Sequence, residues 1–203
     1  MRNGSSLSTI RKVDGMKHTI GILGALAIIA LGAELAQATQ LVSMTPRQMG
    51  EKAQLVVAGR VSGTQSFWNE KRTKIFTQID FAVDASYKGT APAVVSLLQL
   101  GGTIDGVRTT VDGAIQWRVG EEALLFIETY TKGTYQVTGL SQGKFRIERD
   151  PSTGAAFISR PALEGVKLVD AQGAPASGGS SPGAAVEKTP IERFVAEALG
   201  PKK

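Results

Sequence analysis

The residue types that most often carry catalysis are almost absent from this chain of 203 residues, which has no cysteine and one histidine, His18. Without cysteine there can be no disulfide framework, no thiolate metal site and no cysteine nucleophile. His18 falls in a segment that we expect to be removed on export, so the mature chain would lack imidazole as well. Ser-His-Asp and Cys-His catalysis and the usual zinc sites are thereby excluded, and we expect neither a metal nor another cofactor.

The acidic residues are the remaining catalytic candidates, and their spacing argues against them. Glu121 and Glu122 are adjacent, so on a strand their side chains point to opposite faces. Asp80 and Asp84 share one face of an expected strand but lie roughly 13 Å apart, which is wider than either carboxylate pair of the glycosidases. The acids also lack the dense, single-loop spacing of a calcium site. We therefore predict no catalytic residues.

Two tryptophans beside basic residues are better candidates, and the function they indicate is binding. Trp68 precedes the polar stretch 69–74, which contains Arg72, and Trp117 is followed by Arg118. An exposed indole beside a cation can stack on a sugar, a base or a peptide side chain. These four residues form the predicted binding set. The alternative is that both tryptophans cap the core and the cations are solvated at loop tips.

The N-terminal segment is typical of an export signal. Residues 20–33 are apolar and uncharged, and they are followed by Ala36-Gln37-Ala38. The stretch is preceded by a basic flank of Arg11, Lys12 and Lys17. A basic flank, a short apolar stretch and an A-x-A pattern predict a signal peptide cleaved after Ala38, with Ala36 and Ala38 as the recognised pair. An uncleaved anchor is the alternative, but a spanning helix needs about 20 apolar residues.

Charge and export together indicate the compartment and the partner. The whole chain has a formal net charge of +5, part of which belongs to the leader. An excess this small, on an exported chain, does not indicate nucleic-acid binding. We expect a secreted or periplasmic protein of the bacterial envelope, with a protein or glycan as its partner. Contact with the membrane would occur only through the uncleaved signal.

Two helix-start patterns bracket the mature chain. The sequence at 45–48, Thr-Pro-Arg-Gln, predicts a capping box with proline at the first helical position and a short helix to about Lys52. The sequence at 189–192, Thr-Pro-Ile-Glu, repeats the pattern, and apolar residues keep helical spacing until Gly200-Pro201. Because the polar face of this second helix carries as many acids as bases, we expect its apolar face to dock on the domain rather than on a membrane.

Between the helices almost every segment has the pattern of a β-strand. Residues 55–61 are rich in β-branched side chains, and residues 74–87 alternate between an apolar and a polar face, as in an antiparallel sheet. Residues 93–100 and 123–127 are apolar without alternation, so we expect central strands that are covered on both sides. Hairpin turns are predicted at Asp105-Gly106, Asp112-Gly113, Lys132-Gly133 and 150–154.

These patterns predict an all-β chain with an antiparallel, barrel-like domain and short flanking helices. Residues 171–188 consist largely of Ala, Gly, Ser and Pro and cannot bury enough surface to order themselves, so they predict a flexible linker. The expected organisation is a signal peptide at 1–38, a β-barrel-like domain at 39–170, the linker at 171–188 and a C-terminal amphipathic helix at 189–203.

Six short motifs, taken in order, carry a resemblance to known proteins. They are AQLVVAGRV at 53–61, FAVD at 81–84, YKG at 87–89, GG at 101–102, VGEEALLF at 119–126 and QGKF at 142–145. Over about residues 45–147 the chain resembles a family of uncharacterised exported bacterial proteins and, more distantly, the netrin-like module shared with tissue inhibitors of metalloproteinases. The resemblance implies a barrel of the oligonucleotide/oligosaccharide-binding type. It does not imply inhibition, because those inhibitors act through an N-terminal cysteine that this chain lacks.

The sequence as a whole predicts an exported, non-catalytic binding or structural protein of the bacterial envelope. One alternative is an accessory or inhibitor-like partner of an exported enzyme. The other is a carboxylate-dependent hydrolase.

Overall fold

The computed structural model describes residues 39–131, 133–160, 166–176 and 188–201. All of them belong to the second of two units into which the chain divides, Ala38–Lys203. The expected signal peptide, with His18, Ala36 and Ala38, lies outside the described residues, as do residues 177–187 of the expected linker. Within the described part, no helix is both long enough and apolar enough to span a membrane.

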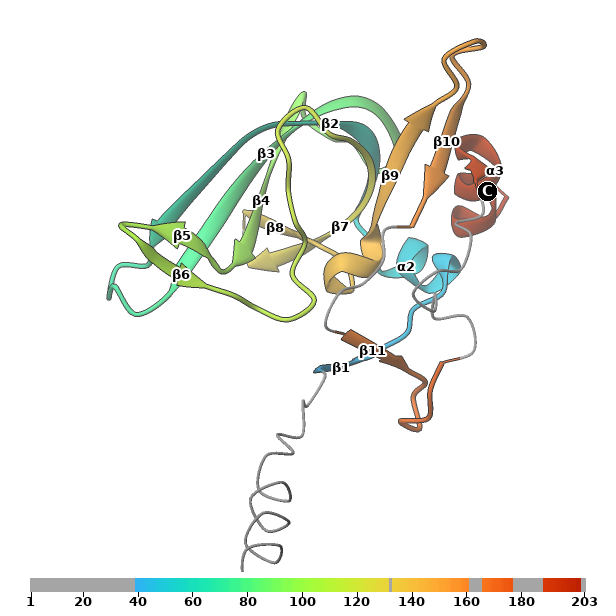
Figure 1. Ribbon diagram of the computed structural model, residues 1–203. Coiled ribbons are helices and arrows are strands. Elements are labelled where there is room, and N and C mark those ends of the chain that lie inside the picture. The colour runs from blue at the N-terminus through green and yellow to red at the C-terminus, as the bar shows by residue number, and fades with distance from the viewer. Residues whose placement is uncertain (1–38, 132, 161–165, 177–187, 202–203) are drawn as a thin grey trace, which may run out of the picture. The chain divides into compact units, whose positions relative to one another are not determined.

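The described part is mostly β-structure, with two α-helices (Figure 1). The longer strands are β2 (Leu55–Trp68), β3 (Ile75–Lys88), β4 (Val94–Leu100), β7 (Glu122–Thr131) and β9 (Lys144–Arg149). The shorter strands are β1 (Thr39–Val42), β5 (Gly102–Ile104), β6 (Val107–Thr109), β8 (Thr134–Val137), β10 (Ala156–Ser159), β11 (Val166–Val169) and β12 (Thr189–Pro190). The helices are α2 (Pro46–Lys52), the 3-10 turn η1 (Leu140–Gly143) and α3 (Ile191–Leu199).

Five strands of the main sheet close into a ring. Going round it, β2 pairs with β3, β3 with β4, β4 with β8, β8 with β7, and β7 again with β2. Four of these junctions are antiparallel, whereas β4 and β8 are parallel and share a single register pair, Leu97 with Tyr135. The ring is therefore only partly closed at this seam. The prediction is confirmed in its coarser form, because the described chain is mostly β-structure with a large antiparallel sheet that partly closes.

Two of the strand predictions are confirmed in detail. Strand β3 alternates as expected, and Ile75, Ile79 and Phe81 on its apolar face are buried. Residues 123–127 of β7 are fully buried because the two faces of the strand pack in two different hydrophobic clusters. Ala123 and Leu125 pack inside the ring, and their neighbours in β7 pack against the helices.

The prediction that residues 93–100 are covered on both sides is wrong. Val95 and Leu97 of β4 are buried, but Val94 is 48% exposed and Leu100 is 40% exposed. The physical reason is the position of the helices, which cover the far side of the ring around β7 and β9 and leave the outer face of β4 to solvent (Figure 1).

The C-terminal helix is part of the core, as its apolar stripe predicted. Helix α3 buries Ile191, Phe194, Val195 and Ala198. The ring of Phe194 lies 6.2 Å from that of Phe126 and 4.6 Å from that of Phe145. Helices α2 and α3 meet where a Cβ on Gly50 would collide with the backbone of Ala198, so a glycine is needed for this close approach.

The two helix starts differ. The capping box of α2 is present, because Gln48 N donates to Thr45 Oγ1 over 3.2 Å and Thr45 N donates to Gln48 Oε1 over 2.8 Å. The same pattern at α3 does not form a cap. Thr189 pairs with Ile158 in the sheet instead, and no side chain caps the helix.

Two of the predicted turns join strands, and one does not. Asp105-Gly106 joins β5 to β6, and residues 150–154 join β9 to β10. Asp112-Gly113 lies in the long connection from β6 to β7 and joins no strands, so that hairpin prediction is wrong. Residues 171–176 fold back on β11, where Ala176 N donates to Leu168 O over 3.0 Å.

Candidate functional site

The long connection from β4 to β7 crosses one end of the ring. It begins with the β5–β6 hairpin and continues as residues 110–121, which we call the crossing segment (Figure 1). All four predicted binding residues lie on this connection or contact it, and the cavities described below lie beside it. The candidate functional site therefore lies at this connection.

Trp68 and Arg72 meet a residue of the β5–β6 hairpin. Trp68 Nε1 donates to Asp105 Oδ2 over 3.3 Å, and an Arg72 nitrogen lies 3.7 Å from the same oxygen. Both charged side chains are exposed, so this ion pair contributes little to stability. The Trp68 hydrogen bond and the Arg72 ion pair both link the β2–β3 tip, residues 69–74 with the adjoining Trp68, to the hairpin beside it.

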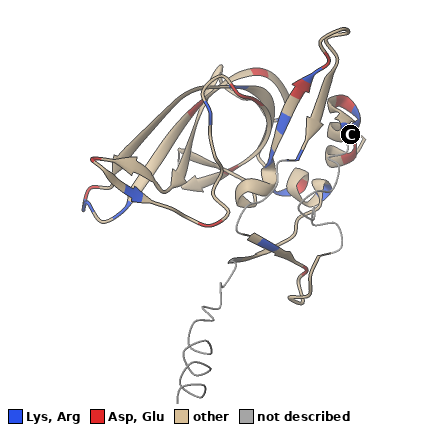
Figure 2. Ribbon diagram, viewed as in Figure 1, with Lys and Arg blue, Asp and Glu red and all other residues tan. Residues whose placement is uncertain are grey.

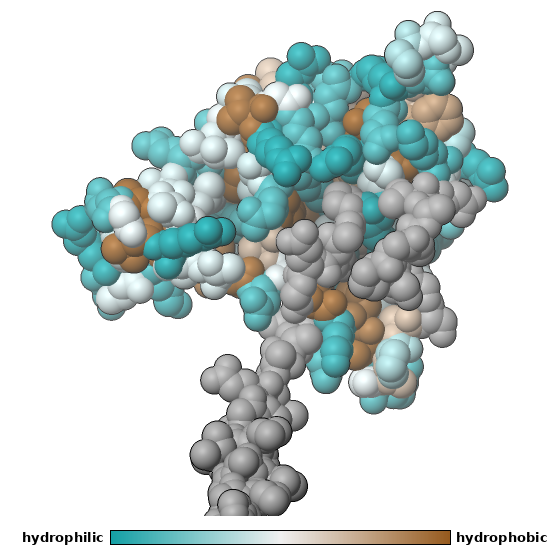
Figure 3. Space-filling model, viewed as in Figure 1, coloured by the Kyte–Doolittle hydropathy of each residue, from teal (hydrophilic) through white to brown (hydrophobic). Residues whose placement is uncertain are grey.

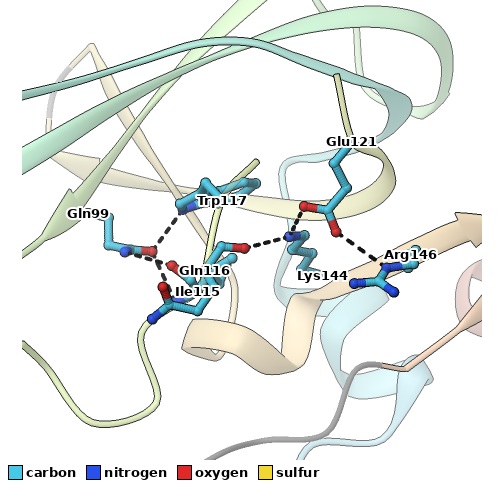
Figure 4. Close-up of polar contacts among 7 residues, drawn as sticks. All are labelled: Gln99, Ile115, Gln116, Trp117, Glu121, Lys144 and Arg146. Atoms are coloured by element: carbon cyan, nitrogen blue, oxygen red, sulfur yellow. Dashed lines mark hydrogen bonds and ion pairs between the residues drawn. The ribbon is translucent and has the colours of Figure 1, made fainter. Parts of the chain in front are cut away.

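Trp117 lies in the opposite environment, packed against the core inside the ring. Its Nε1 donates to Gln99 Oε1 over 3.0 Å, and Lys144 Nζ lies 4.8 Å from the centroid of its ring (Figure 4). This is the capping role that the sequence left open as an alternative. Arg118 is exposed, and its side chain has no hydrogen bond or ion pair with another described residue.

A buried ion pair anchors the crossing segment to β9. Lys144 is 4% exposed, and its Nζ donates to Glu121 Oε2 over 2.7 Å and to Gln116 O over 3.0 Å (Figure 4). Arg146 Nε lies 3.5 Å from the other oxygen of Glu121. Burial lowers the pKa of Lys144, and Glu121 opposes that shift. Because the ammonium group is enclosed and already bonded, the arrangement is suited to holding the segment in place rather than to proton transfer.

A polar cavity of about 190 Å³ lies between the β5–β6 hairpin, the crossing segment and the inner face of the ring. Five threonines line it, together with Arg108 and Gln116. The threonines are Thr64, Thr77, Thr103, Thr109 and Thr110. Thr77 Oγ1 donates to Gly101 O over 2.7 Å, whereas the guanidinium of Arg108 has no hydrogen bond or ion pair with another described residue. The cavity thus offers hydroxyls, backbone groups and the Arg108 guanidinium to a ligand.

Glycine is required beside this cavity. Gly102 has a φ of 141°, and a Cβ there would collide with the hydroxyls of Thr77 and Ser66. The Gly101-Gly102 pair therefore allows the chain to turn closely over β2 and β3 and to form the floor of the cavity.

A second cavity of about 230 Å³ shares part of the same wall, including Gln99, Ile115 and Trp117. The side chain of Gln99 joins β4 to the crossing segment in that wall. Its Oε1 accepts from Ile115 N over 3.2 Å, and its Nε2 donates to Ile115 O over 3.1 Å (Figure 4).

The acidic residues considered in the sequence each have a separate partner. Asp80 accepts from Ser96 Oγ over 2.7 Å, and Asp84 lies 3.7 Å from Arg60. Glu121 points to Lys144, whereas Glu122 points to Arg149, as expected for opposite faces. In the described part of the chain, no three His, Cys, Asp or Glu residues lie close enough together to hold a metal ion.

The sequence did not single out Arg108, Gln99 or Lys144. Arg108 lies in a short mixed stretch, and Gln99 lies near the end of the apolar run 93–100, so neither position has a distinctive local pattern. Lys144 carried a weak signal, because it lies within the QGKF motif and begins a strand whose next residue, Phe145, is buried.

Comparison of the chain with protein-family models, with curated proteins and with solved structures finds no match in any of the three.

Proposed function

We propose that this chain is an exported, non-catalytic binding protein of the bacterial envelope, built on a barrel of the oligonucleotide/oligosaccharide-binding type. Its ligand is an oligosaccharide that carries an acidic group, and it binds in the polar cavity. The observation that carries the proposal is the guanidinium of Arg108, which has no partner among the described residues, in a cavity lined by hydroxyl groups.

The order of strands in the ring supports the barrel type. Numbered along the chain, the five ring strands follow one another around the ring as first, second, third, fifth and fourth. The parallel junction joins the third to the fifth. A five-stranded, partly open barrel of this kind binds ligands on one face and through the loop between its first two strands. In this chain that loop is the β2–β3 tip, which contains Arg72.

The composition of the cavity supports a sugar ligand. Hydroxyl and amide groups can donate and accept, as the hydroxyls of a sugar require, and the half-buried Trp68 beside the same hairpin offers an aromatic surface. Lys and Arg are interspersed with Asp and Glu along β9, α3 and the β2–β3 tip (Figure 2). Such mixed charge favours a ligand with few charges over a nucleic acid.

The experiment is a calorimetric titration of the purified protein with tetragalacturonate, an acidic oligosaccharide, and with the fully N-acetylated chitotetraose, which is neutral. We expect tetragalacturonate to bind more tightly. Arg108→Gln should weaken its binding about tenfold, because a charge-assisted hydrogen bond is lost. Arg193→Gln, on the exposed face of α3, is the matched control and should bind as the parent does.

Equal binding by the two arginine variants would contradict the proposal, and so would no binding of either sugar. Recovery of an exported enzyme bound through the β2–β3 tip, unaffected by Arg108→Gln, would favour the accessory-protein alternative instead.

A further inference from the structure

The second cavity lies at the partly open seam of the ring. Leu97 to Leu100 of β4 line one side of it, and Val137 of β8 lines the other. Val111 and Ile115 of the crossing segment line it as well. Because β4 and β8 share only the Leu97–Tyr135 pair, the strands are not joined along the rest of this side, and the cavity occupies the gap. We call it the seam cavity.

Two amide side chains that line the seam cavity, Gln99 and Gln136, are engaged within the protein, and the exposed Tyr130 lines it as well. Both polar atoms of the Gln99 side chain bond to the crossing segment, and Gln136 Nε2 donates to Glu128 Oε1 over 2.9 Å. The remaining lining is mostly Leu, Ile, Val and Phe, and no charged side chain takes part. A ligand would therefore meet an almost wholly apolar surface, which favours an uncharged, apolar group.

Exposed apolar residues gather at the rim of the seam cavity. On the face shown in Figure 3, hydrophobic residues reach the surface in small separate groups, one of them at the end that carries the β5–β6 hairpin. At the seam cavity, by contrast, three large side chains lie together: Leu100, Tyr130 at 49% exposed and Leu140 at 44% exposed. Clustered exposure of this kind marks binding sites more often than single exposed residues do.

Leu140 is also held in an unfavourable backbone conformation. Its φ is 58°, in the left-handed region that glycine and asparagine tolerate and that branched side chains avoid. The chain thus keeps a leucine where the backbone disfavours it and where its side chain is exposed at the rim. Strain of this kind is found at ligand sites, where the side chain serves binding rather than folding.

We propose that the seam cavity binds an unbranched aliphatic chain. Leu97 to Leu100 line it consecutively, so the cavity extends about 10 Å along β4. An elongated apolar slot suits a chain better than a compact ring system. The polar end of the ligand stays outside, since no unengaged charged group lies within. This site is separate from the polar cavity around Arg108, and the proposal does not depend on the sugar ligand.

The test is a calorimetric titration of the purified protein with hexanoate, octanoate and decanoate. Affinity should rise about fourfold for each added methylene until the slot is full, because each buried methylene contributes a similar transfer free energy. Decan-1-ol should bind within about threefold of decanoate, because the head group is not recognised. Decanoyl-lysophosphatidylcholine tests the natural source of the aliphatic chain. If it binds as tightly as decanoate does, the natural ligand is a lipid tail, and if it does not bind while decanoate does, the natural ligand is a free acid.

Substitutions at Leu140 and Val137 test whether the aliphatic ligand binds in the seam cavity. Leu140→Glu puts a charge at the rim and should weaken decanoate binding at least tenfold, whereas Val119→Glu, at an exposed apolar residue outside the lining, should leave it unchanged. Val137→Phe should fill the slot and abolish binding. If Val137→Phe fails to fold, the comparison of Leu140→Glu with Val119→Glu still decides the question, because both substitutions are at exposed residues.

The proposal is overturned if none of the ten-carbon probes binds. It is equally overturned if affinity does not depend on chain length, or if Leu140→Glu and Val119→Glu bind decanoate alike.

Discussion

Lys144 of β9 and Glu121 of the crossing segment form an ion pair of 2.7 Å in which both side chains are almost completely buried. The pair closes a contact between positions 23 residues apart and lies directly against Trp117. It holds the crossing segment over the end of the ring, and the crossing segment in turn walls both cavities. The stability of the fold and the walls of both cavities therefore depend on the same contact.

Removing one partner of the pair should destabilise the fold. Lys144→Met leaves Glu121 buried with Arg146 as its remaining ion-pair partner among the described residues, and we expect the free energy of unfolding to fall by about 3 kcal/mol. Glu121→Gln alone should also be destabilising, but the double variant should lose less than the sum of the two, with a coupling of about 1–3 kcal/mol. Urea unfolding of the four proteins measures this cycle. Strictly additive losses would show that the pair is not an energetic unit.

The lowered pKa of Lys144 gives stability a specific pH dependence. Between the lowered pKa of the folded state and the ordinary value of 10.5, the unfolded chain binds more protons at this residue than the folded chain does. Its contribution to stability therefore rises with pH through that window. The difference in unfolding free energy between the parent and Lys144→Met should change with pH there, and a flat difference would contradict the assignment.

Asp150 should titrate far below its ordinary range. Its Oδ1 accepts hydrogen bonds from Ser152 Oγ, Thr153 N and Ser152 N, which lower its pKa from 3.8 to about 2. Because the folded pKa is depressed, this carboxylate stabilises the β9–β10 turn above pH 3.8 and loses that effect as the pH falls towards 2. NMR titration of the Asp150 carboxyl carbon measures the midpoint. A midpoint near 3.8 would mean that the turn does not hold the carboxylate.

Gly50 should not tolerate a side chain. Gly50→Ala places a methyl group against the backbone of Ala198, so helices α2 and α3 must separate and the free energy of unfolding should fall by about 1–3 kcal/mol. Gly63→Ala is the matched control, since a Cβ there meets only an Asp80 side-chain oxygen at an ordinary distance of 3.9 Å. Thermal unfolding of both variants provides the measurement, and equal losses would argue against tight helix contact.

Local patterns predicted the local structures well. The alternation of β3 and the capping box at Thr45 depend only on neighbouring residues, and both are present. The unbroken apolar run of β7 was predicted to be buried on both faces, and it is. In each case, the sequence itself contains the period or the spacing that determines the structure.

The errors and omissions came from contacts between distant segments. The outer face of β4 is exposed because the helices pack elsewhere, and nothing within residues 93–100 encodes that choice. Thr189 pairs with Ile158 in the sheet instead of capping a helix. Lys144 is buried because the chain brings Glu121 and a carbonyl oxygen to it from the crossing segment. A lysine on a short strand gives no local indication of such partners.

The central claim is that the polar cavity around Arg108 receives an acidic oligosaccharide. The most direct measurement is NMR chemical-shift mapping of the backbone amides of the protein during titration with tetragalacturonate. We predict saturable shift changes concentrated at the residues of the cavity, above all at Gly101, Gly102, Thr109 and Thr110. Saturable changes confined to other surfaces, such as α2 and α3, or no changes at all, would contradict the claim.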